Sequence, residues 1–302
     1  MADRLGIFFG LPEDAYHADT ALGSTDIKDL FHSPCDWQWK RLHPEEPEKK
    51  SHLDIGTSVH ELVLLGKESF LKRIEKSPYP DFRKKEAREW RDQVLADGKV
   101  ILTEDEYEQV IAAAGAILNS PNLRSEFTNG VPEVSIFWEE DGIRMKGRYD
   151  YLKIRGVVDL KTFSEKFQQS LLRTVTGTIA DRRYDLQACH YQHGRKAMLG
   201  LFEKGLVYGD PQPKKDWLEK VCKCENPAWV WVFFKTTGAP VAFSANPMNM
   251  RHMWRNAEED REIAIENYRK FRDKFTDAEI WVEEIEQFVL ADEDLPPWMG
   301  RR

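Results

Sequence analysis

The segment from residue 142 to residue 162 constrains the fold more than any other part of the chain. Ile143, Met145 and Tyr149 alternate there with charged residues, and this period-two pattern predicts a strand with one buried face. We expect a turn at 153–156, where Gly156 can adopt a positive φ, and a second strand at 157–161. The segment therefore predicts a β-hairpin.

This hairpin would bring three charged side chains together. Asp159 and Lys161 are two positions apart on one strand and share a face, and pairing across the turn would bring Asp150 close to both. Two neighbouring carboxylates can hold a hard cation such as Mg²⁺, and a lysine beside them can stabilise a developing anion. A surface hairpin with scattered salt bridges, each contributing about 0 to 1 kcal/mol, would have the same pattern. The hairpin alone leaves both interpretations open.

Helices and further strands are predicted around the hairpin. Thr103 and Glu106 form a capping box, and an Asp141-Gly142 turn joins the strand at 133–138 to the hairpin, giving a three-stranded meander. Helices are predicted at 24–31, at 82–98, at 103–119, at 181–199, at 246–275 and from Asp54 or Thr57 to Gly66, and strands at 228–234 and 240–245. We expect one α/β domain over 1–302, with a mainly helical part at 1–125 and a sheet core with a C-terminal helix at 126–302.

Two of these helices carry candidate site residues. His60 lies beside the apolar face of the helix that ends at Gly66, where a lone histidine is more often a packing residue than a ligand. Gln187 and Tyr191 are four apart and share one face of the helix at 181–199. A solvated helix face with an amphipathic tyrosine is the alternative there.

The charge distribution bears on possible partners. The net charge of −8 argues against a nucleic-acid partner when taken alone. Residues 142–196, however, contain 12 Lys or Arg and 5 Asp or Glu, whereas residues 277–294 contain 8 acidic residues and no basic one. A basic centre in acidic surroundings fits a channel for a phosphate backbone. It fits equally well a protein whose charges cluster without a function.

The cysteines and apolar stretches indicate the compartment. The four cysteines, at positions 35, 189, 222 and 224, are too few and too irregularly spaced for a disulfide framework. Cys222 and Cys224 lack the Cys-x₂-Cys spacing of zinc sites. No apolar stretch approaches the ~18 residues of a membrane span, and the N-terminus lacks the layout of a signal peptide. We therefore expect a reduced, cytoplasmic protein with no membrane partner.

The order of these motifs resembles a known enzyme superfamily. Gly56-x-x-x-His60, Glu133, Asp150, Asp159-Leu160-Lys161 and Gln187-x-x-x-Tyr191 resemble the PD-(D/E)xK nucleases, specifically their RecB-like branch. Further motifs are similar to the C-terminal nuclease domain of exonuclease VIII (RecE): Tyr16-His17, Ser24, Ser33-Pro34 and Pro296-Pro297-Trp298. The likeness spans nearly the whole chain, although Tyr149 stands where the motif has proline. It implies a restriction-endonuclease-like core, with a central mixed sheet that contains an antiparallel meander and is flanked by helices.

The resemblance also implies roles for these residues. Asp150 and Asp159 would be catalytic, metal-binding carboxylates, Lys161 the catalytic lysine and His60 a further metal ligand. Glu133 lies near the position of an accessory acid, and a surface glutamate is the alternative. The remaining candidates would contact DNA: Gln187 and Tyr191 by lining its channel or orienting the site, and Arg144, Lys146 and Arg148 by holding phosphates from the Asp150 face of the strand.

The implied activity is that of a Mg²⁺-dependent deoxyribonuclease, with Mn²⁺ as the alternative ion. By resemblance it would be a 5′–3′ exonuclease on linear double-stranded DNA. It would leave 3′ single-stranded tails for recombination with an annealing protein, form a homo-oligomer and come from a phage or prophage. A structure-specific or single-strand nuclease of the same fold is one alternative, and a non-catalytic DNA-binding protein that keeps the fold is another. A hydrolase of small phosphate esters is disfavoured because no glycine-rich phosphate loop is present.

Overall fold

The computed structural model describes residues 4–44, 51–164, 169–276, 279–284, 291 and 294, and only the backbone of residues 51–54. The Pro-Pro-Trp motif at 296–298 lies outside these residues. The helices up to the central sheet are α1 (Glu13–His17), α2 (Ser24–His32), α3 (Pro34–Leu42), α4 (Ser51–His60), the π-helix η1 (Glu61–Leu65), α5 (Gly66–Arg73), α6 (Lys85–Ala96), α7 (Glu104–Leu118) and α8 (Pro121–Glu126). Those after it are α9 (Leu171–Asp181), α10 (Tyr184–Glu203), α11 (Lys215–Cys222) and α12 (Arg251–Lys274). The strands are β1 (Gly6–Phe9), β2 (Ile74–Lys76), β3 (Val100–Leu102), β4 (Gly130–Glu140), β5 (Ile143–Lys153), β6 (Gly156–Phe163), β7 (Val207–Gly209), β8 (Ala228–Lys235) and β9 (Ala242–Ala245).

The predicted meander is formed by β4, β5 and β6, which pair antiparallel in sequence order. Asp141 and Gly142 connect β4 to β5 with φ values of 49° and 77°, as a tight hairpin turn requires. The positive φ expected at Gly156 is wrong. A Cβ atom there would lie 2.8 Å from the carbonyl oxygen of Ala228, so the glycine instead lets β8 approach β6 closely.

The meander is the centre of a seven-stranded mixed sheet with the order β7-β1-β4-β5-β6-β8-β9. β8 joins β6 in parallel and β9 pairs antiparallel with β8. On the other side, β1 pairs antiparallel with β4 and β7 pairs in parallel with β1. The mixed sheet with its antiparallel meander confirms the predicted fold class, although β1 and β7 were not among the predicted strands.

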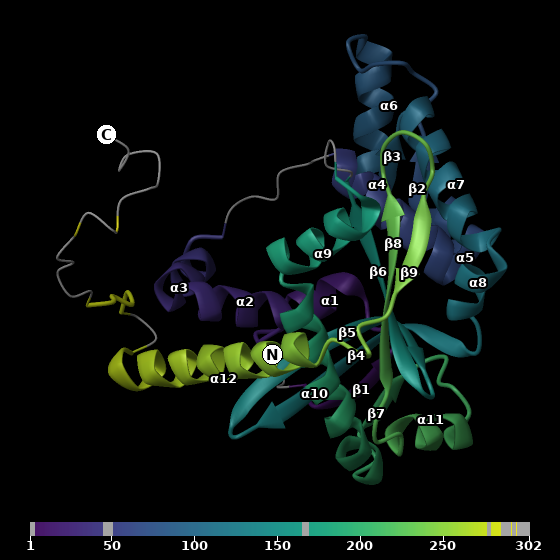
Figure 1. The fold of residues 1–302 in the computed structure, drawn as a ribbon. Coiled ribbons are helices and arrows are strands. Elements are labelled where there is room, and N and C mark those ends of the chain that lie inside the picture. The colour runs from purple at the N-terminus through teal and green to yellow at the C-terminus, as the bar shows by residue number, and fades with distance from the viewer. Residues whose placement is uncertain are drawn as a thin grey trace.

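Helices cover both faces of the sheet (Figure 1). On one face, Ile136, Tyr149 and Trp231 belong to a core that also contains residues of α2, α9 and α10. On the other face, Leu160 and Val232 belong to a second core with residues of α4, α5 and α7. The apolar strand β8 contributes to both cores, because its successive side chains point to opposite faces.

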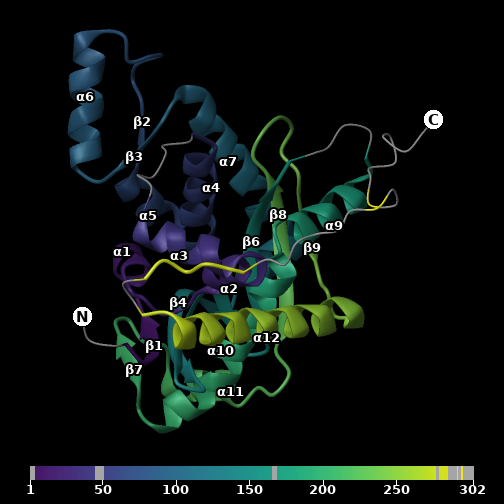
Figure 2. The ribbon, with the colours of Figure 1, turned by 90° about the vertical axis from the view of Figure 1, so that its left-hand side faces the viewer.

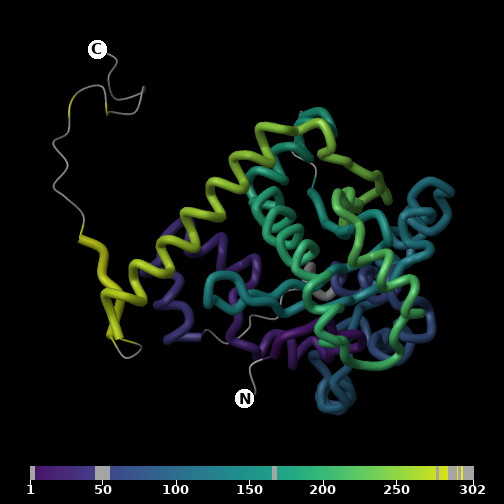
Figure 3. The backbone as a smooth tube through the Cα atoms, turned by 90° about the horizontal axis from the view of Figure 1, so that it is seen from below, coloured from purple at the N-terminus to yellow at the C-terminus, as the bar shows by residue number. Residues whose placement is uncertain are grey.

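The long helix α12 forms an outer layer, packed against α10, α2 and α3 (Figures 2 and 3). Its buried residues include Ala264 and Phe271. The segment after it turns back, and the Trp281 ring lies 5.3 Å from the rings of both Trp37 and Phe271. None of the described helices is both long enough and apolar enough to cross a bilayer.

Candidate active site

The site begins where β5 and β6 separate. The two strands pair only from Tyr151 and Val158 to their turn. Beyond these pairs, Oδ2 of Asp150 accepts the main-chain N–H of Leu160 at 2.7 Å. A side chain thus satisfies an amide that the ladder leaves unpaired. The Asp150 carboxylate is thereby fixed in the gap between the two strands.

A matching irregularity lies in β4. Its register pairs Pro132 with Tyr151 and Val134 with Tyr149, which leaves Glu133 and Asp150 between these two pairs. Glu133 has a φ of 54°, a left-handed conformation that costs a non-glycine residue about 1–3 kcal/mol. Backbone strain of this kind concentrates at functional sites. The strained residue lies where the two carboxylates face each other.

Helix α4 supplies the third group. It ends at His60 and continues directly into η1, and π-helical turns are frequent at functional sites. Nδ1 of His60 lies 3.8 Å from Oδ2 of Asp150. Donor atoms of His60, Glu133 and Asp150 all lie within 4.8 Å of one another. The structure therefore brings together His60 and Asp150, both predicted metal ligands, and Glu133, which the sequence indicated as an accessory acid.

Asp159 and Lys161 form a buried ion pair on β6. Nζ of Lys161 lies 2.7 Å from Oδ2 of Asp159, and the two side chains are 13% and 1% exposed. Beyond this ion pair, the Asp159 oxygens have no hydrogen-bond partner among the described residues. A buried carboxylate whose partner is one lysine has acceptor capacity left for a ligand. Asp159 is not part of the group that His60, Glu133 and Asp150 form.

Burial and neighbouring charges shift the pKa values of the three acids, His60 and Lys161. Burial, followed by the Asp150 charge, raises the pKa of Glu133 to about 8. Burial raises the pKa of Asp150, and it raises that of Asp159 to about 6 although Lys161 opposes it. Burial and the Lys161 cation lower the pKa of His60 to about 4. Burial lowers the pKa of Lys161, but Asp159 and Asp150 outweigh this and raise it. His60 is therefore neutral and Lys161 stays protonated. The three acids cannot all ionise unless another positive charge is present.

A cavity of about 590 Å³ opens beside these groups, and its lining includes His60, Glu133, Asp150, Tyr16, Arg73 and Tyr191. Its volume is in the range of small-ligand sites. Arg73 lies on its rim, half-exposed, with Nη1 2.8 Å from Glu61 and Nη2 3.5 Å from Glu13. Sequence reasoning missed Arg73 because no local motif marks it.

Lys28 is a second residue that sequence reasoning missed. Its ammonium lies 5.5 Å from the centre of the Tyr184 ring, and that of Lys161 lies 5.1 Å from the same ring. Burial and then the Lys161 charge lower the pKa of Lys28 to about 8. A second ammonium group, which loses its proton more readily than an ordinary lysine, therefore lies beside Lys161.

Two residues that were predicted to contact phosphate, Arg144 and Lys146, already bind groups of the protein itself. Arg144 donates to both Asp19 oxygens at 3.0 and 3.1 Å. The ammonium of Lys146 donates to the carbonyl oxygens of Tyr16 and Asp19 at 3.1 and 2.6 Å. Both side chains thus fasten the N-terminal segment to the sheet. Their DNA-binding role stays a prediction, and these contacts weigh against it.

Arg148 lies nearer the candidate ligands. It donates to Ser135 Oγ at 2.8 Å and to the carbonyl oxygen of Leu11, and its Nη1 is 3.6 Å from Glu133. It also lines the cavity. Of the three basic residues predicted on this strand, Arg148 is the one that faces the site.

Helix α10 contributes Tyr191 to the cavity. A Cβ atom on Gly147 would lie 3.2 Å from this ring, so glycine on β5 leaves room for the tyrosine. The Tyr149 hydroxyl donates to the carbonyl oxygen of Tyr191 at 3.1 Å. Gln187 lies one turn earlier on α10 and is partly buried. The two residues share a helix face as predicted, and their contact with DNA stays a prediction.

The donor set fits a hard divalent cation. Carboxylate oxygens and a neutral imidazole suit Mg²⁺ or Mn²⁺, and a cation here would compensate the excess of acids. The spare acceptor capacity of Asp159 and the strained Glu133 are consistent with a site completed by a bound ion.

Comparisons with known proteins identify a family and a solved structure of similar fold. The model of a family described as "PDDEXK-like domain of unknown function (DUF3799)" matches residues 23–205, which include His60, the three acids and Lys161. A crystal structure of a candidate exonuclease from Eubacterium rectale is similar in fold, with a TM-score of 0.55 and 15% sequence identity over 90% of this chain and 89% of that chain. No curated protein matches the sequence. The chain therefore belongs to this family of PDDEXK-like domains, within the PD-(D/E)xK nuclease superfamily.

Proposed function

We propose that the protein is a divalent-metal-dependent deoxyribonuclease that acts at the ends of linear duplex DNA. One observation carries the proposal: the donor atoms of His60, Glu133 and Asp150 lie within 4.8 Å of one another, beside the buried pair of Asp159 and Lys161. The name of the Eubacterium rectale protein, a candidate exonuclease, supports the same reaction class.

Each group has a role that its chemistry allows. His60, Glu133 and Asp150 would hold Mg²⁺, with Asp159 available as a further carboxylate. The ion would supply Lewis acidity, which favours deprotonation of a water and offsets charge on a phosphoryl oxygen. Lys161 keeps its proton because its pKa is raised, so it would stabilise the negative charge that develops on the attacked phosphate.

The finer properties come from the resemblance to exonuclease VIII. They are degradation of one strand from 5′ to 3′, production of 3′ single-stranded tails for recombination, assembly into a homo-oligomer and cooperation with an annealing protein, in a phage or prophage setting. A structure-specific or single-strand nuclease would use the same residues, so the substrate has to be tested directly.

The test uses end-labelled linear duplex, with closed circular duplex as a second substrate. We expect the wild-type protein to degrade only the linear DNA, to need Mg²⁺ and to stop when EDTA is added. Asp159→Ala and Lys161→Ala should each lose activity. The control is the exposed pair Asp216 and Lys220, whose side chains are 70% and 65% exposed and whose alanine variants should keep activity.

Three results would refute parts of this proposal. Equal activity in the wild type and both site variants would refute the site assignment. Cleavage of circular or single-stranded DNA would favour the structure-specific nuclease. DNA binding without cleavage by any variant, wild type included, would favour the non-catalytic protein.

A further inference from the structure

A second cluster of ligand-type side chains lies where α10 meets α12. Cys189 and His193 are four apart on α10, so they share one face of that helix. Tyr191, which lines the active-site cavity, is two positions from each and is therefore rotated by about 200° from both. The cluster is thus on the side of α10 that faces away from the proposed nuclease site.

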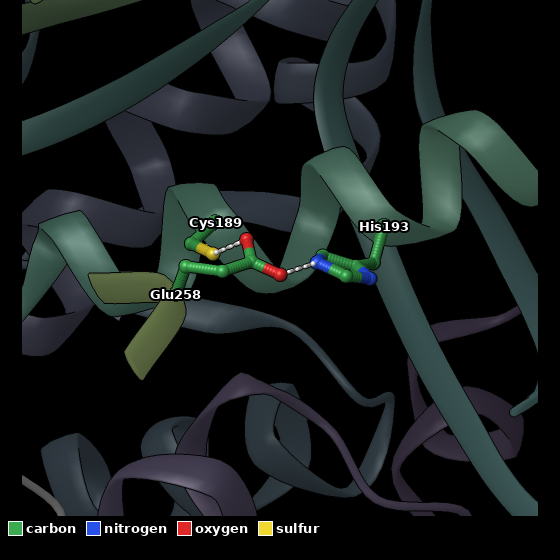
Figure 4. A group of neighbouring side chains, drawn as sticks. All are labelled: Cys189, His193 and Glu258. Carbon is green, nitrogen blue, oxygen red and sulfur yellow. Dashed lines mark hydrogen bonds and ion pairs between the residues drawn. The ribbon is translucent and has the colours of Figure 1, made fainter. Parts of the chain in front are cut away.

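Glu258 of α12 completes the cluster. Figure 4 shows its carboxylate between the other two side chains. The thiol of Cys189 donates to Oε2 at 3.2 Å, and Nε2 of His193 lies 2.7 Å from Oε1. One donor atom from each of the three residues lies within 4.8 Å of the other two. The sulfur is buried, whereas the Glu258 side chain is 41% exposed, which leaves a route from solvent.

A second carboxylate lies near the histidine, beyond direct hydrogen-bond distance. Oε2 of Glu140, at the end of β4, lies 3.7 Å from the other ring nitrogen of His193. The buried guanidinium of Arg261 in turn fixes Glu140 by two hydrogen bonds, of 2.9 and 2.5 Å. A carboxylate beside the second nitrogen is the usual companion of a metal-binding histidine.

The types of donor select the ion. A thiolate is a soft ligand that Mg²⁺ and Ca²⁺ avoid, whereas Zn²⁺ accepts sulfur, imidazole nitrogen and carboxylate oxygen together. Zn–ligand bonds are about 2.0–2.3 Å long, so tetrahedral ligand atoms lie within ~4 Å of one another. Small rotations of three side chains that already touch would reach this arrangement. A bound cation would also deprotonate the buried thiol.

We infer that Cys189, His193 and Glu258 form a Zn²⁺ site, with water as the fourth ligand, that links helix α12 to helix α10. This site is separate from the proposed nuclease centre and has a different ligand chemistry. Without the ion, the same three groups form a hydrogen-bonded chain from thiol to carboxylate to imidazole.

Cobalt(II), a spectroscopic substitute for zinc, tests the inference on the full chain after reduction and metal removal. Coordination by a thiolate produces a sulfur-to-cobalt charge-transfer band in the near ultraviolet. The His60 and carboxylate site has no sulfur and cannot produce it. We expect the band in the wild type, its saturation at one equivalent per chain in Asp150→Asn, which weakens the other candidate site, and its disappearance when Zn²⁺ is added.

The variants decide the assignment. Cys189→Ser should abolish the band, whereas the matched control Cys222→Ser, also at a buried helical cysteine, should retain it. His193→Asn and Glu258→Gln keep the buried thiol and should need at least tenfold more cobalt for the same signal, with far-ultraviolet circular dichroism confirming the fold. Any of four results would overturn the inference. They are absence of the band in the wild type, its survival in Cys189→Ser, its loss in Cys222→Ser, and unchanged titrations in His193→Asn and Glu258→Gln.

Discussion

The two candidate metal sites lie on opposite sides of α10 and differ in how well they are satisfied without an ion. At the candidate nuclease site, Glu133 is strained, its pKa is raised to about 8, and the Asp159 oxygens have no partner beyond Lys161 among the described residues. At the α10–α12 site, by contrast, Cys189 and His193 both contact the Glu258 carboxylate.

This difference shows how ligand chemistry determines what a metal-free site looks like. Several carboxylates gathered for a hard cation repel one another, so perturbed pKa values and strain reveal the site. A thiol, an imidazole and one carboxylate can instead hydrogen-bond among themselves. A site of the second kind is recognised only from its donor types and spacing.

The largest expected effect separates the two sites by activity. Asp150→Asn removes a charged ligand at the nuclease site and should lower the cleavage rate on the order of 10³-fold, since metal-assisted charge stabilisation contributes several kcal/mol. Glu258→Gln should leave the rate on linear duplex unchanged. A comparable loss in both variants would mean that the two sites are not functionally independent.

The second prediction concerns stability. In an Asp150→Asn background, Zn²⁺ at about 100 times its dissociation constant should raise the free energy of unfolding by about 2.7 kcal/mol, because the ion binds only the folded chain. Thermal melts with and without zinc measure this as a higher melting temperature. Adding Glu258→Gln, which should weaken binding at least tenfold, should reduce the increase to about 1.4 kcal/mol or less at the same zinc concentration. An equal increase in that double variant would place the stabilising ion elsewhere.

The third prediction uses the raised pKa of Glu133. With a pKa of about 8, this carboxyl carries a proton at pH 7 that Mg²⁺ must displace. Affinity for Mg²⁺ should therefore rise about tenfold per pH unit up to pH ~8 and then level off. Glu133→Gln should remove this slope between pH 7 and 8, and the dependence that remains at lower pH belongs to Asp150 and Asp159, whose pKa values are also raised. Calorimetric titration without DNA measures both slopes, and equal slopes would exclude Glu133 as a ligand.

Local sequence rules predicted the centre of the fold. Alternation along β5 and the Asp141-Gly142 turn define the meander, and two-residue spacing on one strand accounts for the contact between Asp159 and Lys161. The proximity of these residues could be derived because it depends on neighbours in sequence. Their catalytic roles rest on the resemblance and stay predictions.

Long-range packing decided what the sequence could not predict. Alternation places Arg144 and Lys146 on the Asp150 face, but it cannot reveal that the segment around Asp19 covers that end of the face. The positive φ of Glu133 likewise depends on its neighbours in the fold. Helical spacing would have paired Cys189 with His193, but Glu258 is 65 residues further along and joins them only through the packing of α12 on α10.

Lys28 gives the smallest expected effect, because it lies beside the nuclease site without touching the ligand group. Lys28→Met removes a cation near Lys161, which would contact the attacked phosphate, so KM for linear duplex should rise about three- to fivefold at pH 7, equivalent to about 0.6–1 kcal/mol. Because the pKa of Lys28 is about 8, the wild-type side chain is mostly neutral at pH 9, and the two proteins should then have similar KM values. Lys220→Met, at an exposed lysine, is the control and should match the wild type at both pH values. A difference between Lys28→Met and the wild type that persists at pH 9 would mean that Lys28 acts through packing against Tyr184 rather than through its charge.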